Sequence, residues 1–311
     1  MSTHSSLYHS QRSYPLLAVG VAAGCAIVWS FLAVVAKKAQ LYVDSFQFLF
    51  FSNSLSLLSL AIIAFFSKTP WHITLFPPLK TLKHAAILGT LDGLFYLLIY
   101  KGYSLENGVA VLAAQYCWPL LIVFLSSLIF RYKPHIIQVF SLILGFCALL
   151  LVFFKTAHTP TLPLSENHHW LGIILVLAGA FCFALLSVLS RYFFFSPVGG
   201  TFWLFMFSTF CSALLLVMFG KLSWPPLQAW LPIAINGLVI NGPSYVLWIW
   251  AMRHGDAAKI SSMTFLAPIL SVIWLVFLTG EPFVPLYAIA LAGIVGAGIV
   301  CFSFSHKKTS R

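Results

Sequence analysis

Ten long apolar segments, separated by short polar loops, constrain this 311-residue chain more than any other feature. Each approaches the length of about 20 mostly apolar residues that an α-helix needs to cross a bilayer. Outer-membrane barrels instead show alternating segments of about ten residues, and these segments do not alternate. The sequence therefore predicts an all-α integral membrane protein with ten transmembrane helices, at residues 15–36, 46–66, 84–100, 108–130, 134–154, 170–190, 199–219, 229–250, 258–279 and 283–304.

Composition excludes the other large classes of protein. Hydrophobic residues make up 61% of the chain and charged residues only 7%, against roughly 25% charged residues in an ordinary soluble domain. Disordered chains are poor in apolar residues and rich in charge, so disorder is excluded as well. The six cysteines lie in predicted spans and show no metal-binding spacing, so we read them as small packing residues. No metal and no cofactor is expected.

The basic residues predict the orientation of the chain. With the N-terminus inside, twelve of the seventeen Lys and Arg residues lie in cytoplasmic segments and five lie outside. This asymmetry favours cytoplasmic positions for both termini. The net charge of +11 is then explained by topology and by contacts with anionic membrane lipids, and no nucleic-acid partner is expected.

The two halves of the chain repeat one another at an offset of about 150 residues. The matched pairs at an offset of 149 are Asp92 with Asn241, Tyr96 with Tyr245, and Tyr116 with Phe265. Near the start of each half the offset is 154, which aligns Trp29 with Phe183. Five helices per half is an odd number, so the second half enters from the opposite side, as in the inverted repeats of many secondary transporters. The predicted divisions are a tail at 1–14, a first repeat at 15–154, a linker at 155–169, a second repeat at 170–304 and a tail at 305–311.

Several short motifs resemble a known family. In the second half these are GDAA at 255–258, PIL at 268–270, GEP at 280–282 and a glycine-rich stretch at 293–298. With ten helices in two repeats, the chain resembles the EamA family of the drug/metabolite transporter superfamily. The first half departs from the family at 131–132, where RY replaces a Gly-Glu pair. The motifs WS at 29–30 and YCWP at 116–119 are similar to the aromatic amino-acid exporter branch.

The resemblance implies a transporter rather than an enzyme. It implies a carrier of small metabolites in the bacterial inner membrane, with a central cavity between the repeats and alternating access. Two substrate classes fit: amino acids, chiefly aromatic ones, or exchange of S-adenosylmethionine for S-adenosylhomocysteine in a host-dependent bacterium. An intramembrane lipid-modifying enzyme is a distant alternative, because it needs a convergent catalytic set that the loops do not offer.

Asp92 is the only carboxylate well inside a predicted span. It lies about eight residues, or roughly 12 Å, from the inner end of its helix. Because polar groups inside a bilayer are costly, Asp92 is a candidate site for a substrate amine or a coupling proton. The alternative is a carboxylate that caps a neighbouring helix or reaches interfacial water.

Aromatic and polar groups recur on two helical faces that are related by the repeat. Aromatic rings offer an apolar body to a planar ligand and can also hold a cation. The alternative for the deep rings is a packed core, whereas Tyr103 fits the interfacial aromatic belt. The predicted substrate-binding residues are Trp29, Asp92, Tyr96, Gln115, Tyr116, Trp118, Asn241, Tyr245 and Trp248.

Two prolines and a pair of glycines are candidates for conformational and packing roles. Pro119 and Pro268 fall within the fourth and ninth predicted spans, where a proline kinks a helix. We interpret them as gating residues, with a fixed packing kink as the alternative. Gly20 and Gly24 form a pair spaced for close helix approach, either within the monomer or across a homodimer.

Overall fold

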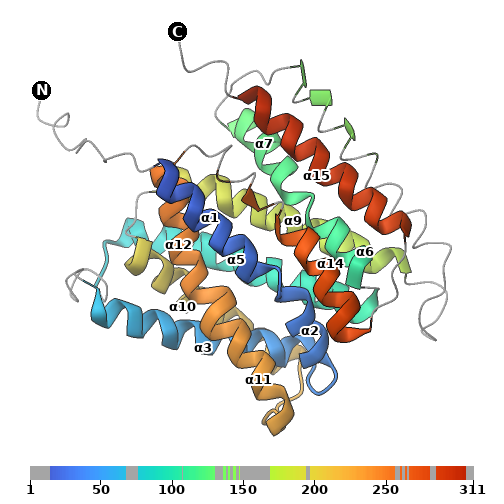
Figure 1. The fold of residues 1–311 in the computed structure, drawn as a ribbon. Coiled ribbons are helices and arrows are strands. Elements are labelled where there is room, and N and C mark those ends of the chain that lie inside the picture. The colour runs from blue at the N-terminus through green and yellow to red at the C-terminus, as the bar shows by residue number, and fades with distance from the viewer. Residues whose placement is uncertain are drawn as a thin grey trace, which may run out of the picture.

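A computed structural model describes residues 15–67, 76–106, 108–129, 169–193, 197–255 and 266–305 except 281–284, with single positions between 136 and 147 and between 260 and 264. Every element within these described stretches is helical (Figure 1). The predicted fifth span, the linker, both tails and the start of the ninth span fall almost entirely outside the described residues.

Seven helical stretches in the described part of the chain are long and apolar enough to cross a membrane. This confirms an all-helical, multi-pass membrane protein, while the count of ten helices and the repeat stay predictions. The stretches are α1 (Pro15–Trp29) with α2 (Leu32–Gln40), α3 (Ser45–Phe66), α5 (Leu79–Leu105), α6 (Gly108–Gln115) with α7 (Trp118–Ile129), α9 (His169–Tyr192), α10 (Pro197–Phe219), and α11 (Leu227–Ile235) with η1 (Asn236–Asn241) and α12 (Gly242–His254). The remaining helices with described bounds are α14 (Leu266–Thr279), which has 14 residues, and α15 (Pro285–Ser305), which has 21 residues.

The helix α5 runs through the middle of the bundle, and α9 and α10 pack against it (Figure 1). It is longer than the predicted span 84–100, because basic and polar residues extend it at both ends. Near its C-terminal end, the Lys101 ammonium lies 4.4 Å from the centre of the Phe46 ring. This contact between a cation and an aromatic ring lets a charged residue continue the helix.

Small residues permit the closest helix contacts. A Cβ atom at Gly89 would lie 2.4 Å from the Leu204 carbonyl oxygen, so α5 and α10 touch there through their backbones. In contrast, a Cβ atom at Gly20 or Gly24 would have nothing within 4 Å among the described atoms. This glycine pair therefore mediates no close helix contact within the described monomer.

Asp44 starts α3 and ties it to another loop. Its carboxylate accepts hydrogen bonds from the backbone N–H groups of Phe46 and Gln47, at 2.8 and 2.9 Å, and Gln47 reciprocates in a capping box. The second carboxylate oxygen accepts a hydrogen bond of 3.0 Å from the Lys221 backbone, just after α10. Asp44 is thus a structural cap.

The first membrane span is broken at Ser30 and Phe31, although a continuous helix over 15–36 is predicted. The Ser271 hydroxyl of α14 donates to the Ser30 carbonyl oxygen at 2.6 Å, and the Trp274 indole donates to the Ser30 hydroxyl at 3.0 Å. Freed backbone groups at membrane depth are tolerated where other groups pair with them. No proline or glycine marks this break, so the local sequence carries no signal for it.

The Ser271 hydrogen bond should be measurable in stability. Replacing Ser271 with alanine leaves a buried carbonyl with one partner fewer, which costs about 1–2 kcal/mol. We expect a lower unfolding temperature in detergent. Ser127 is the matched control, because its hydroxyl bonds only to Phe124 of its own helix and is exposed. Equal unfolding temperatures for Ser271→Ala and Ser127→Ala would contradict this account of the break.

The predicted kinks at the two prolines are corrected by the structure. The fourth span breaks at Tyr116 and Cys117, and Pro119 is the second residue of the new helix α7. Pro268 is likewise the third residue of α14. Because the first turn of a helix needs no intrahelical N–H partner, each proline is accommodated at a helix start rather than bending a helix interior. Gating at these positions stays a prediction.

A stretch of π-helix, η1, interrupts the helix from α11 to α12. Pro243 follows it and has no N–H group with which to continue a regular helix. The Ser56 hydroxyl of α3 donates to the Gly237 carbonyl oxygen at 3.0 Å, which holds the widened turn. Such π-bulges are frequent at functional sites.

Candidate functional site

Helix breaks place two tryptophans at the centre of the bundle. Trp29 is the last residue of α1 and Trp118 is the first residue of α7, so each lies beside an interruption in its span. Both side chains are buried. At a helix end, one of the neighbouring helical turns is missing. The ring of such a residue can therefore point across the interior of the bundle.

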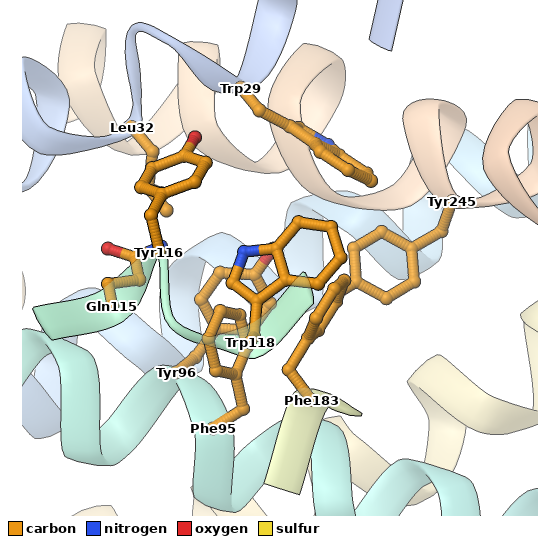
Figure 2. A pocket seen from close by; sticks show the side chains of 9 residues that line it. All are labelled: Trp29, Leu32, Phe95, Tyr96, Gln115, Tyr116, Trp118, Phe183 and Tyr245. Carbon is orange, nitrogen blue, oxygen red and sulfur yellow. The ribbon is translucent and has the colours of Figure 1, made fainter. Parts of the chain in front are cut away.

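These two tryptophans form the wall of a small internal cavity. Figure 2 shows their rings facing Phe183 from α9 and Tyr245 from α12, with Tyr96 below. The cavity volume is about 20 Å³. The full lining consists of Trp29, Leu32, Phe95, Tyr96, Gln115, Tyr116, Trp118, Phe183 and Tyr245.

Ring contacts close the cavity. Trp118 packs edge-on against Phe183, with ring centres 4.9 Å apart, and Trp29 packs edge-on against Phe183 at 6.1 Å. A cavity of this volume holds about one water molecule, whereas ligand sites usually measure about 300–1,000 Å³. The cavity is therefore too narrow for a metabolite, which fits only when these rings separate.

Polar groups at the edge of the cavity are held in fixed orientations. The Trp29 indole N–H donates to the Ser244 hydroxyl at 2.7 Å, and the Tyr103 hydroxyl donates to the Gln115 side-chain oxygen at 3.2 Å. Tyr103 is buried within the bundle, near the C-terminal end of α5. The bond from Tyr103 uses the Gln115 side-chain oxygen as acceptor, and the amide nitrogen of the same Gln115 side chain is a hydrogen-bond donor.

Asp92 lies outside this cavity, in a buried polar cluster between α5, α10 and α3. The Ser208 hydroxyl donates to one carboxylate oxygen at 2.8 Å, and the Asn53 amide donates to the Ser208 hydroxyl at 2.9 Å. The Tyr245 hydroxyl faces Asp92 and Tyr96, without a hydrogen bond of standard geometry. Tyr245 is therefore the side chain that the polar cluster and the cavity share.

The structure brings together six of the nine predicted binding residues, namely Trp29, Tyr96, Gln115, Tyr116, Trp118 and Tyr245. The other three, Asp92, Asn241 and Trp248, do not line the cavity. Trp248 packs behind Trp29, with ring centres 5.1 Å apart, and is buried together with Asn241. Their helices turn these side chains toward neighbouring helices instead of the cavity.

Sequence reasoning missed three lining residues: Leu32, Phe95 and Phe183. Leu32 and Phe95 carry no polar atom that marks them in a chain so rich in apolar residues. Phe183 had a signal, because the repeat aligns it with Trp29. The two rings in fact meet edge-on at an interplanar angle of 89°.

A second polar cluster links α2 to the end of α5. The Lys37 ammonium donates to the Glu106 backbone carbonyl at 3.0 Å, and Gln40 donates to the Tyr100 carbonyl at 2.7 Å. Glu106 lies just beyond the spanning segment. Burial raises the pKa of its carboxyl to about 7, and the nearby Lys37 opposes that rise. Glu106 thus titrates close to neutral pH.

Several apolar helices that enclose a buried aromatic cavity define a multi-pass membrane protein with an internal site. The profile of the EamA-like transporter family matches residues 16–154 and 170–304. The chain therefore belongs to the EamA-like transporter family, whose members are membrane transporters.

Individual proteins are also similar to this chain. The aromatic amino acid exporter YddG of Ancylobacter novellus is 25% identical over 221 residues, which are 68% of this chain and 73% of the exporter. A solved crystal structure with 23% identity superimposes with a TM-score of 0.70, covering 94% of this chain and 99% of the other. That likeness shows the fold alone.

Proposed function

We propose that the protein is an alternating-access carrier of an aromatic amino acid or a compound derived from an amino acid. The observation that carries the proposal is the closed aromatic cavity, whose walls come from both halves of the chain. Trp29 and Trp118 from the first half meet Phe183 and Tyr245 from the second. A site between two halves is open to each side in turn when the halves rock against one another.

The chemistry of the lining suits a ligand with a flat apolar body. Aromatic rings bind such a body by stacking and edge contacts. The Gln115 amide and the Tyr116 hydroxyl line the same cavity and are suited to bind the polar amino-acid moiety. The exporter from Ancylobacter novellus supports an aromatic amino acid as substrate.

The inverted repeat and the inner-membrane location are parts of the same proposal. Two separate matches to one family profile, at 16–154 and 170–304, support a chain of two related halves. The beginning of α1 and the end of α15 lie toward the same side in Figure 1, which supports termini on one side of the membrane. The charge asymmetry of the loops supports the cytoplasm as that side.

A counterflow assay tests the proposal. Liposomes that contain the purified full-length protein are loaded with unlabelled substrate and diluted into a labelled trace of the same compound. We expect phenylalanine, tyrosine and tryptophan to give a transient overshoot, because a carrier with one alternating site exchanges its ligand. Glycine and glutamate should give none, since the cavity has no basic side chain and needs a large body to fill it.

S-adenosylmethionine and adenosine belong in the same panel. A sulfonium cation would bind to ring faces, because none of the described residues that line the cavity is a carboxylate. Overshoot with S-adenosylmethionine and none with aromatic amino acids would replace the proposed substrate with the second class. Overshoot with neither class would overturn the proposal.

A further inference from the structure

Asp92 carries a fully buried carboxylate inside a membrane-spanning helix. The residue is 0% exposed. One oxygen accepts the Ser208 hydrogen bond, whereas the other has no hydrogen-bond partner. No Lys, Arg or His side chain within the described stretches forms an ion pair with it.

The surroundings of Asp92 are polar but uncharged. The titratable groups that face it are phenols, Tyr96 and Tyr100 of its own helix and Tyr245 of α12. From α10 it accepts a hydrogen bond from the neutral Ser208, which in turn accepts one from the neutral Asn53 of α3. A permanent negative charge inside a bilayer without a cation is costly, so this position suits a carboxyl that gains and loses a proton.

The cluster also supplies an acceptor for that proton. The Tyr245 hydroxyl is buried, lies beside Asp92 and has no hydrogen bond of standard geometry. A protonated Asp92 can donate its O–H to this hydroxyl, whereas an ionised Asp92 can accept a hydrogen bond from it. The hydrogen-bond pattern of the cluster therefore differs between the two protonation states.

Tyr245 connects this cluster to the cavity. Its ring forms part of the cavity wall (Figure 2), and its hydroxyl faces Asp92. A substrate that displaces the Tyr245 ring must also move its hydroxyl. Protonation of Asp92 changes whether that hydroxyl can donate or accept a hydrogen bond there. Two sites that bias one side chain are coupled, and the coupling is reciprocal.

We propose that Asp92 is a proton-binding site separate from the substrate cavity, and that Tyr245 couples the two. The proton enters from water on one side, binds a carboxylate oxygen of Asp92 and leaves to water on the other side, with no covalent change in the substrate. This inference rests on the proposed function, because it assigns a driving ion to that carrier.

Three measurements on liposomes with the full-length protein separate the two proposals. The first is phenylalanine counterflow at equal pH, the second is phenylalanine accumulation under a pH gradient of either orientation, and the third is accumulation under a sodium gradient. We expect overshoot in the first, accumulation in the second for one orientation, and none in the third. Failure of counterflow overturns the proposed function. Counterflow without any effect of the pH gradient overturns only the proton site, and so does accumulation driven by sodium.

The variant Asp92→Asn keeps the shape of the side chain and removes its titration. We expect the pH gradient to drive no more phenylalanine accumulation than is seen without a gradient, when both values are divided by the counterflow rate of the same variant. The matched variants Asp44→Asn and Glu106→Gln remove other carboxyls and should keep the wild-type ratio. If Asp92→Asn keeps the gradient response, or if Glu106→Gln abolishes it, the assignment to Asp92 is wrong.

A readout that needs no variant guards against misfolding. If proton and substrate are coupled, phenylalanine added to the detergent-solubilised wild type must release or take up protons. A pH-sensitive dye in weak buffer should report this change, and it should saturate with phenylalanine concentration. No proton exchange at saturating phenylalanine would overturn the proposal.

Discussion

Replacing Trp118 with alanine should lower the rate of phenylalanine counterflow at least about 30-fold, the equivalent of roughly 2 kcal/mol. The side chain is 2% exposed and packs edge-on against both Phe183 and Trp248. Each such ring pair contributes about 0.5–1.5 kcal/mol beyond area burial, and Trp118 also supplies the surface that a planar substrate would contact. Because Trp118 begins α7 directly after the break, no neighbouring residue of its own helix replaces its ring.

The loss of transport has to be separated from loss of folding. Replacing a buried Trp with alanine costs about 3–5 kcal/mol of stability, so each variant is first checked for a monodisperse peak and for its unfolding temperature. Trp118→Phe keeps an aromatic ring and should retain more counterflow than Trp118→Ala. Trp170→Ala is the matched control, since that tryptophan is 49% exposed at the start of α9. Normal counterflow in folded Trp118→Ala would show that the cavity is not the transport site.

Introducing a methyl group at Gly89 should destabilise the protein more than the same substitution at Gly20 or Gly24. The new Cβ atom would lie 2.4 Å from the Leu204 carbonyl oxygen and 2.8 Å from the Phe207 Cβ atom. These atoms belong to the backbone and first side-chain carbon of α10, which cannot rotate away, so the two helices must separate. Overpacking of this kind costs about 1–3 kcal/mol, and occasionally more.

The same separation would reach the buried carboxyl. Ser208 follows Phe207 on α10 and donates to Asp92, one turn beyond Gly89. We therefore expect Gly89→Ala to lower the unfolding temperature markedly, and also to weaken the response to a pH gradient. Gly20→Ala and Gly24→Ala are controls, because nothing lies within 4 Å of either new atom and alanine favours a helix. Equal unfolding temperatures for Gly89→Ala and Gly20→Ala would contradict the described contact between α5 and α10.

Six of the nine predicted residues line the cavity, whereas the choice of helical face was not predictable from the sequence. Tyr96 and Asp92 lie on one helix four residues apart, yet Tyr96 lines the cavity and Asp92 faces α3 and α10. Residues four positions apart differ in direction by about 40°, since a helix has 3.6 residues per turn. Around a helix packed on several sides, that angle is enough to point two side chains at different neighbours.

The sequence by itself determined the class of the protein. Its apolar segments can be solvated only by lipid and by one another, and its basic residues predict an orientation, because both properties depend on composition along the chain. Only the tertiary structure decided which residues meet. The break at Ser30 depends on the Ser271 hydroxyl, 241 positions away, and the cavity depends on Phe183 facing Trp29. Nearly every residue of these helices is apolar, so hydrophobic pattern cannot distinguish a face that meets lipid from one that meets a helix. That distinction arises when the helices pack.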